Sequence, residues 1–136
     1  MKIKNIAIWA LFLLVLLTLA GCDSREEDAE NIVSYQQITA EEAKSMMEEQ
    51  PDAAILDVRE QDEYDAGHIP GAVLLTVGTI NEETAASVIP EKDTVVLVYC
   101  RSGNRSKTAS QALADLGYTQ IYEFGGIKDW PYEVER

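Results

Sequence analysis

The stretch that decides the fold is residues 94–106, which read TVVLVYCRSGNRS. Its first half is an unbroken β-branched and apolar run, which is typical of a strand buried on both faces. Its second half is a short polar loop that begins at Cys100 and includes Gly103. Apolar residues then recur at helical spacing from Ala109 to Leu116. The sequence therefore predicts a buried strand that ends near Cys100, a loop, and a helix.

A cysteine at this place is expected to be a reactive thiol. The thiolate is the nucleophilic form, and the unpaired N–H groups of a helix N-terminus lower the pKa of a nearby thiol. Gly103 lets the loop turn tightly and bring its backbone close to a bound group. We expect six residues to form a substrate-binding loop around Cys100, with the two serines as hydrogen-bond donors rather than nucleophiles. These are Arg101, Ser102, Gly103, Asn104, Arg105 and Ser106.

Charge and composition narrow the class of partner. The chain has 136 residues, enough for one domain and a short extra segment, and its formal net charge is −13. Such acidity argues against a nucleic acid partner, because phosphate binding needs clustered Lys and Arg. A local basic cluster, Arg101, Arg105 and Lys107, surrounds Cys100 and indicates a small anionic substrate. Ordinary solvated side chains at a helix start are the alternative.

The N-terminal segment has the layout of a secretory signal. Lys2 and Lys4 precede an apolar run over residues 6–17, and small residues lead to Cys22. The stretch 19–22, LAGC, resembles the bacterial lipobox. That resemblance implies cleavage after residue 21 and lipidation of Cys22, and two acyl chains are enough for stable anchoring. The alternative is an uncleaved transmembrane anchor, for which the run is short. Either alternative puts the folded domain outside the cytoplasm, at a membrane surface.

The N-terminal signal and the lipobox divide the chain into three parts. We expect a signal peptide over residues 1–21, an acidic flexible tether over residues 22–33, and one folded domain over residues 34–136. The chain has two cysteines, which excludes a multi-cysteine zinc site and a disulfide framework. If Cys22 carries lipid, Cys100 is the sole free thiol, so dithiol exchange is excluded and any chemistry uses one sulfur.

Short strands alternate with helices along residues 34–136. This pattern predicts an α/β fold with a parallel sheet covered by helices on both faces. Thr39 and Asn81 are placed to cap two of the helices, and Gly125-Gly126 is expected to break the last strand. The expected strands are a first short strand within 32–38, then 53–58, 73–75, 94–98 and 119–124. The expected helices are 40–50, a short turn within 59–66, 82–89, one ending near 116, and 127–130. Ligands of open α/β sheets bind at the carboxyl ends of strands, where Cys100 lies.

Several motifs in a fixed order resemble a known family. They are DVRE at 57–60, EY at 63–64, GHIPGA at 67–72, YCRSGNRS at 99–106, GGI at 125–127 and WP at 130–131. Together they look like a single-domain rhodanese, of the sulfurtransferase family, over residues 35–132. The resemblance implies a rhodanese-like domain with a central five-stranded parallel sheet. It also implies that Cys100 is catalytic and that no metal or organic cofactor is needed.

The reaction that the resemblance implies is sulfur transfer. Cys100 would take a sulfane sulfur from thiosulfate or another persulfide, then pass it to a thiophilic acceptor such as cyanide or a thiol. A two-step transfer of this kind needs one activated nucleophile. Arg101 and Arg105 can hold the anionic donor by charge-assisted hydrogen bonds, with Arg105 the stronger candidate and Arg101 facing solvent. We expect a monomer, tied to the membrane through Cys22.

Three further polar residues near the motifs are expected to be structural. Asp57 follows a buried strand and is expected to pair with an arginine or with backbone N–H groups, and Arg59 belongs to the same motif. His68, the one histidine, is expected to be a turn residue with satisfied nitrogens. A general base is not required where the loop already produces a thiolate.

Two other functions fit the same cysteine loop. A Cys-dependent phosphatase or arsenate reductase cradles an oxyanion in a related loop, but with one more residue before the arginine; here four residues separate Cys100 from Arg105. A persulfide carrier or sulfur-sensing module would use the same cradle without turnover.

Overall fold

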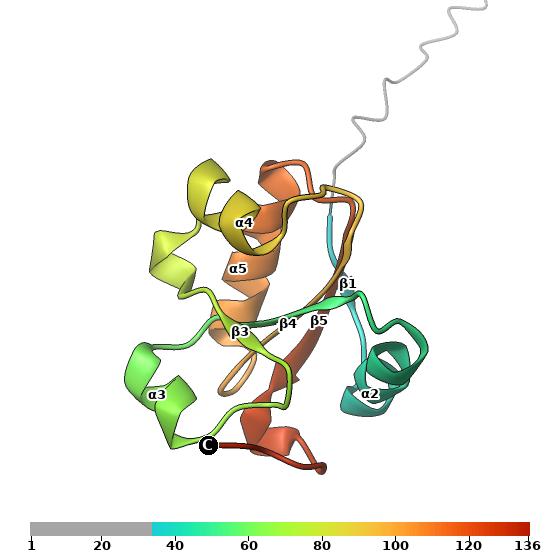
Figure 1. The fold of residues 1–136 in the computed structure, drawn as a ribbon, viewed down its shortest axis with the longest axis vertical. Coiled ribbons are helices and arrows are strands. Elements are labelled where there is room, and N and C mark those ends of the chain that lie inside the picture. Colours follow the sequence, from blue (N-terminus) through green and yellow to red (C-terminus); the bar gives the residue numbers. More distant parts are fainter. Residues whose placement is uncertain (1–33) are drawn as a thin grey trace, which may run out of the picture. The chain divides into compact units, whose positions relative to one another are not determined.

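A computed structural model of the chain describes residues 34–136. Five parallel strands form one sheet in the order β1-β5-β4-β2-β3 (Figure 1). The α/β fold with a five-stranded parallel sheet is therefore confirmed. The strands are β1 (Gln36–Gln37), β2 (Ala54–Asp57), β3 (Val73–Leu74), β4 (Val95–Cys100) and β5 (Gln120–Gly126).

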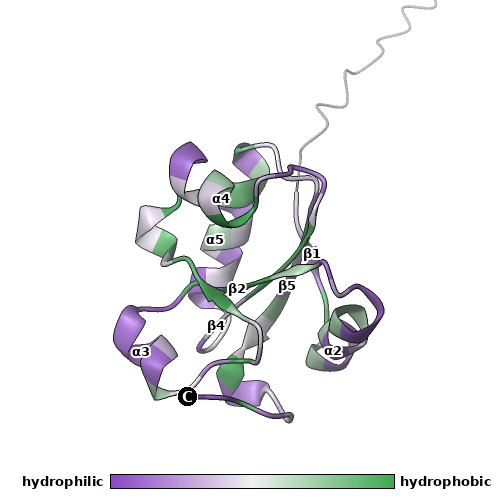
Figure 2. Ribbon diagram, in the orientation of Figure 1, coloured by the Kyte–Doolittle hydropathy of each residue, from purple (hydrophilic) through white to green (hydrophobic). Residues whose placement is uncertain are grey.

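Helices cover both faces of the sheet. In Figure 1, α2 (Ala40–Glu49) lies on one side of the strands, and α4 (Glu82–Val88) and α5 (Asn104–Asp115) lie on the other. The short α3 (Gln61–Ala66) follows β2. Strand β4 serves both layers: Val96, Val98 and Cys100 pack in the apolar cluster with α4 and α5, whereas Leu97 and Tyr99 pack in the cluster with α2. The central strands are accordingly among the most hydrophobic parts of the ribbon (Figure 2).

The predicted helix caps form as expected. Thr39 Oγ1 accepts the Glu42 N–H at 3.1 Å, and Glu42 Oε2 accepts the Thr39 N–H at 2.7 Å, which completes a capping box. Asn81 Oδ1 likewise accepts the Thr84 N–H at 3.0 Å at the start of α4. Each cap satisfies backbone donors that the first helical turn leaves unpaired.

The first short strand, expected within residues 32–38, is Gln36–Gln37, the residues that pair with β5. Three segments differ from the sequence-based expectation. Strand β5 does not break at its glycines but runs on to Gly126, which pairs with Cys100. The closing helix, η2 (Ile127–Asp129), is a 3₁₀ turn, and a second 3₁₀ turn, η1 (Val77–Thr79), was not predicted.

The predicted signal peptide, tether and lipidation at Cys22 lie outside the described residues. Within residues 34–136, none of the helices has both the length and the apolar character to cross a membrane.

Candidate active site

The candidate nucleophile lies at the carboxyl end of the central strand. Cys100 is the last residue of β4 and its side chain is buried, with 1% of its surface exposed. A three-residue loop, residues 101–103, follows Cys100 and ends at Gly103, and α5 starts at the next residue. The φ of Gly103, +102°, is a left-handed conformation that glycine adopts without strain. The thiol is thus held between the end of a strand and the start of a helix.

Hydrogen-bond donors around the sulfur favour the thiolate. The Gly103 N–H donates to Cys100 Sγ at 3.0 Å, and Ser106 Oγ lies 3.4 Å from Sγ. Burial raises the pKa of the Cys100 thiol, but hydrogen bonds from the Ser106 hydroxyl and from the N–H groups of Ser106, Gly103 and Ser102 outweigh it. The pKa of Cys100 therefore lies below its ordinary value, the change that makes a cysteine a nucleophile at neutral pH.

The end of β5 forms the floor on which the loop rests. A Cβ on Gly126 would lie 1.9 Å from the Arg101 carbonyl oxygen, so only glycine fits there. A Cβ on Gly103 would contact Gly125 Cα at 3.5 Å. The Lys128 N–H also donates to the Arg101 carbonyl, at 3.2 Å. Gly126, the second glycine of the GGI motif, thus lets the loop backbone approach the strand.

Arg105, the stronger candidate for anion binding, is ion-paired. Its guanidinium donates to both carboxylate oxygens of Glu63 on α3, at 2.7 and 2.8 Å. The hydrogen bonds from Arg105 hold the pKa of Glu63 at about 2, and Glu63 in turn raises the pKa of Arg105. The pair ties the start of α5 to α3, and the role of Arg105 toward a substrate remains a prediction.

One of the remaining loop residues, Arg101, lines a small cavity beside the loop in which cations outnumber carboxylates. Arg101 is exposed, as expected, and it lines a cavity of about 370 Å³ together with Arg59, Glu63, Ala66, Ile127 and Lys128. Asn104 is the exposed first residue of α5, and Ser102 contributes its N–H toward the sulfur. Lys128 was not singled out from the sequence, because a lone lysine in a closing turn carries no local signal.

Asp57 and Arg59 form a buried ion pair behind the loop. Arg59 donates to Asp57 through its backbone N–H at 3.0 Å and through Nη2 at 2.6 Å, and Nη2 also donates to the Gly67 carbonyl at 2.7 Å. The Tyr99 hydroxyl donates to Asp57 at 2.7 Å and accepts the Ile69 N–H at 3.0 Å. Burial, with the Asp57 hydrogen bond, raises the pKa of Tyr99. This network fixes the turns that follow β2 and α3.

His68 contacts Tyr64 and Glu135 and takes no part in the hydrogen bonds around Cys100. Its Nδ1 lies 2.9 Å from the Tyr64 carbonyl oxygen, and its ring stacks on the Tyr64 ring with centroids 3.8 Å apart. Its Nε2 lies 3.3 Å from Glu135 Oε1, and the two backbones form an isolated antiparallel bridge. Both ring nitrogens of His68 therefore have partners, Nδ1 on α3 and Nε2 near the C-terminal end of the chain.

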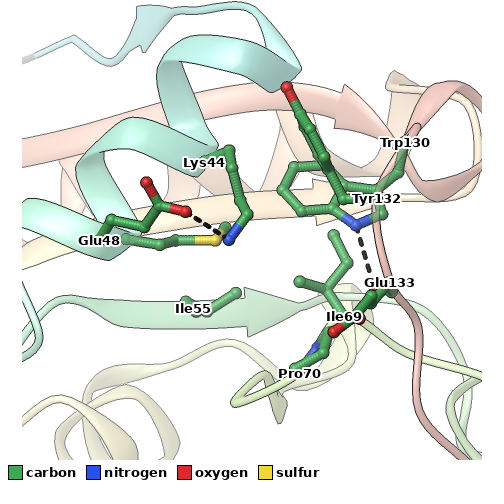
Figure 3. Close-up of a pocket in the computed structure, with 9 residues that line it drawn as sticks. Lys44, Glu48, Ile55, Ile69, Pro70, Trp130, Tyr132 and Glu133 are labelled. Atoms are coloured by element: carbon green, nitrogen blue, oxygen red, sulfur yellow. Dashed lines mark hydrogen bonds and ion pairs between the residues drawn. The ribbon is translucent and has the colours of Figure 1, made fainter.

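A second cavity, of about 540 Å³, lies on the α2 side of the sheet (Figure 3). Its lining includes Lys44, Ile55, Ile69, Trp130 and Tyr132, and none of the candidate site residues. The ion pair of Lys44 with Glu48 and the hydrogen bond from Trp130 to the Glu133 carbonyl border it. No sequence motif indicated this cavity. Residues 34–136 contain no cluster of three or more potential metal ligands.

Comparison with known proteins agrees with this geometry. GlpE of Coxiella burnetii, named thiosulfate sulfurtransferase, is 34% identical over 71% of this chain and 87% of its own length. YrkF of Bacillus subtilis, named as a candidate sulfur carrier protein, is 32% identical over 81% of this chain, which spans only 58% of YrkF. A solved structure described as rhodanese with anions from Escherichia coli matches with a TM-score of 0.58 and 31% identity, covering 62% of this chain and 98% of that one.

The family model for the rhodanese-like domain matches residues 39–132, which include every strand except β1 and all the candidate loop residues. This chain therefore belongs to the rhodanese-like domain family.

Proposed function

We propose that this protein is a sulfurtransferase that carries a sulfane sulfur on Cys100. The observation that carries the proposal is the position of Cys100 Sγ, 3.0 Å from the Gly103 N–H at the start of α5, with further donors from Ser102 and Ser106. Such a cradle stabilises an anion on sulfur, both the thiolate and the outer sulfur of a persulfide. The name of the relative GlpE, thiosulfate sulfurtransferase, supports the same reaction class.

The chemistry balances without a cofactor. The Cys100 thiolate attacks the outer sulfur of thiosulfate, a new S–S bond forms, and sulfite leaves with the electron pair of the broken bond. An acceptor, cyanide or a thiolate, then attacks the outer sulfur of the Cys100 persulfide. The electron pair of that S–S bond returns to Sγ and regenerates the thiolate. Each step is a displacement at sulfur with one nucleophile, as a single free thiol requires.

The cationic cavity beside the loop suits an anionic donor. Of the cations that line it, Arg59 is engaged by Asp57, whereas among the described residues Arg101 and Lys128 form no ion pair. On a chain of net charge −13, these two side chains offer a local site for a small anion. Arg105, held by Glu63, keeps the loop in register and adds positive charge near Sγ.

A carrier role is the second candidate. The 1% exposure of Cys100 fits a persulfide that small thiols reach slowly, and the name of YrkF fits a sulfur that is carried rather than turned over. The two roles differ in turnover. A sulfurtransferase releases sulfur repeatedly to small acceptors, whereas a carrier retains a stable persulfide in their presence.

Steady-state kinetics with thiosulfate and cyanide test the proposal. The full chain with Cys22→Ser, purified in detergent, has Cys100 as its one thiol. We expect thiocyanate production that Cys100→Ser abolishes, and no hydrolysis of an aryl phosphate. Activity retained in Cys100→Ser would overturn the proposal. Bound persulfide without turnover would favour the carrier role, and phosphate release would favour the phosphatase alternative.

We further propose that Cys22 is lipidated and that the domain works outside the cytoplasm at a membrane surface. The LAGC stretch after an apolar run supports this assignment. Expression in bacteria with labelled palmitate provides the test. We expect label in the membrane fraction that Cys22→Ser removes. Label in both chains, or in neither, would contradict the assignment. Size-exclusion chromatography of residues 34–136 would test the predicted monomer.

A further inference from the structure

A buried carboxylate lies beneath the candidate active site and has no part in the function proposed above. Glu123, on β5, has 2% of its surface exposed. Along β5 it follows Ile121 on the face covered by α5, the face on which Cys100 also packs. Its Oε1 lies 2.5 Å from Ser106 Oγ and accepts the Gly125 N–H at 2.9 Å. Among residues 34–136, no lysine or arginine forms an ion pair with it.

Ser106 links this carboxylate to the nucleophile. Its hydroxyl lies 3.4 Å from Cys100 Sγ and 2.5 Å from Glu123 Oε1, with the Gly125 carbonyl at 3.3 Å. A serine hydroxyl has one hydrogen to donate and lone pairs to accept. Ser106 can therefore donate to Glu123 while accepting from the Cys100 thiol, or donate to the Cys100 thiolate while accepting from a protonated Glu123.

The two arrangements differ only in where a single negative charge sits, on Glu123 in the first and on Cys100 in the second. We infer that Glu123 holds the proton that Cys100 gives up, passed through the Ser106 hydroxyl. The S–H bond of Cys100 breaks as a new Oγ–H bond forms, and the former Oγ–H proton moves to Oε1 of Glu123. No charge enters or leaves the site, and Ser106 ends as the hydrogen-bond donor to the thiolate.

The surroundings explain why sharing one charge is favoured. Two neighbouring anions buried in a protein repel strongly, so one of them stays protonated. Arg105 of α5 is a cation near enough to Cys100 for the thiol to raise its pKa, but Glu63 of α3 already binds its guanidinium. Arg101 is exposed on the loop, and β4 and β1 face Glu123 through their paired backbones at Val98 and Gln37. A protonated Glu123 thus avoids a second buried charge.

Infrared and ultraviolet spectra of the full chain with Cys22→Ser test the inference. We expect that, as pH rises and thiolate absorbance appears, the spectrum contains the carbonyl band of a protonated carboxyl. Glu123→Gln is expected to remove that band and keep the thiolate, because its amide donates to Ser106 as the protonated carboxyl does. Cys100→Ser is expected to remove the band too, because the proton source is gone.

Two serines on the same face of α5 give a matched pair of variants. Ser106→Ala cuts the link and is expected to shift thiolate formation upward by about one pH unit, since coupled groups interact by about that much or more. Ser110, also fully buried and one turn further along, has no hydrogen-bond partner within residues 34–136. Ser110→Ala is expected to leave both spectra unchanged.

A thiolate without a carboxyl band that depends on Glu123 would overturn the inference, as would a band that persists in Cys100→Ser. If Glu123→Gln fails to fold, the Cys100→Ser and Ser106→Ala spectra still decide. The inference rests on the proposed function for its meaning, but no sulfur donor is used in these measurements. An inactive protein with the linked spectra would refute the proposed function alone.

Discussion

The buried pair behind the loop gives a sharp prediction on stability, through the substitution Asp57→Asn. Asp57 is fully buried, and the Arg59 side chain is 6% exposed. Asp57 accepts from the Arg59 N–H and Nε on one oxygen, and from Arg59 Nη2 and the Tyr99 hydroxyl on the other. Asparagine can replace one of these oxygens but turns the other into an amide that faces two donors.

The magnitude follows from what the substitution leaves behind. Arg59 keeps the Gly67 carbonyl as a partner but becomes a buried cation without a counter-charge. Breaking a buried pair on one side typically costs about 3–5 kcal/mol, and each charge-assisted hydrogen bond accounts for roughly 1.5–3 kcal/mol. We therefore expect Asp57→Asn to lower the free energy of unfolding by about 3–5 kcal/mol, a large part of the stability of a domain of this size.

Urea unfolding followed by circular dichroism measures this loss. Glu82→Gln is the matched control, because it removes one carboxylate of an exposed pair with Lys92, whose side chains are 67% and 37% exposed. Exposed pairs contribute about 0–1 kcal/mol. An Asp57→Asn loss no larger than the Glu82→Gln loss would refute the reasoning that the Asp57 network holds the turns together.

Two further predictions concern the Arg105 pair and the loop floor. Because the folded protein holds the pKa of Glu63 at about 2, below its usual value of 4.5, the stability it contributes is present above pH 4.5 and is lost as pH falls toward 2. Glu63→Gln should flatten the loss of stability below pH 4.5, seen in urea midpoints measured across the acid range; an unchanged slope would contradict this assignment. Gly126→Ala should prevent a native loop, since its Cβ would overlap the Arg101 carbonyl at 1.9 Å, whereas Gly78→Ala has no atom within 4 Å and should fold normally, by circular dichroism. Equal stability of the two alanine variants would show that the close approach of the Arg101 carbonyl to Gly126 is not needed for the fold.

Local patterns predicted most of the fold because they are local physical requirements. The apolar run before Cys100 and the capping residues Thr39 and Asn81 each specify their own element, and the structure has all three. The extent of β5 was not predictable in this way. Gly126 stays in the strand because Cys100 pairs with it, and the position requires glycine because the Arg101 carbonyl leaves no room for a side chain. Both facts depend on the assembled sheet.

The candidate site was likewise predictable only where its residues lie close together in the sequence. The thiol, the turn at Gly103 and the helix behind them lie within one short stretch, so sequence reasoning could place them. The partners of that stretch lie far along the chain: Glu63 is 42 residues before Arg105, and Glu123 is 17 residues after Ser106. Glu123 lies in the middle of β5 and Glu63 lies on α3, and nothing in the sequence around either residue indicates which side chain it faces. The EY motif included Glu63, but its pairing with Arg105 is seen only in the tertiary structure.

The most direct test of the central claim is the mass of Cys100 after exposure to thiosulfate. The full chain with Cys22→Ser is incubated with thiosulfate, freed of excess reagent, and digested for mass spectrometry. We predict one added sulfur atom on the peptide that contains Cys100, lost again when cyanide is added with the appearance of thiocyanate. An unmodified Cys100 peptide, or added sulfur on a chain that carries Cys100→Ser, would contradict the account.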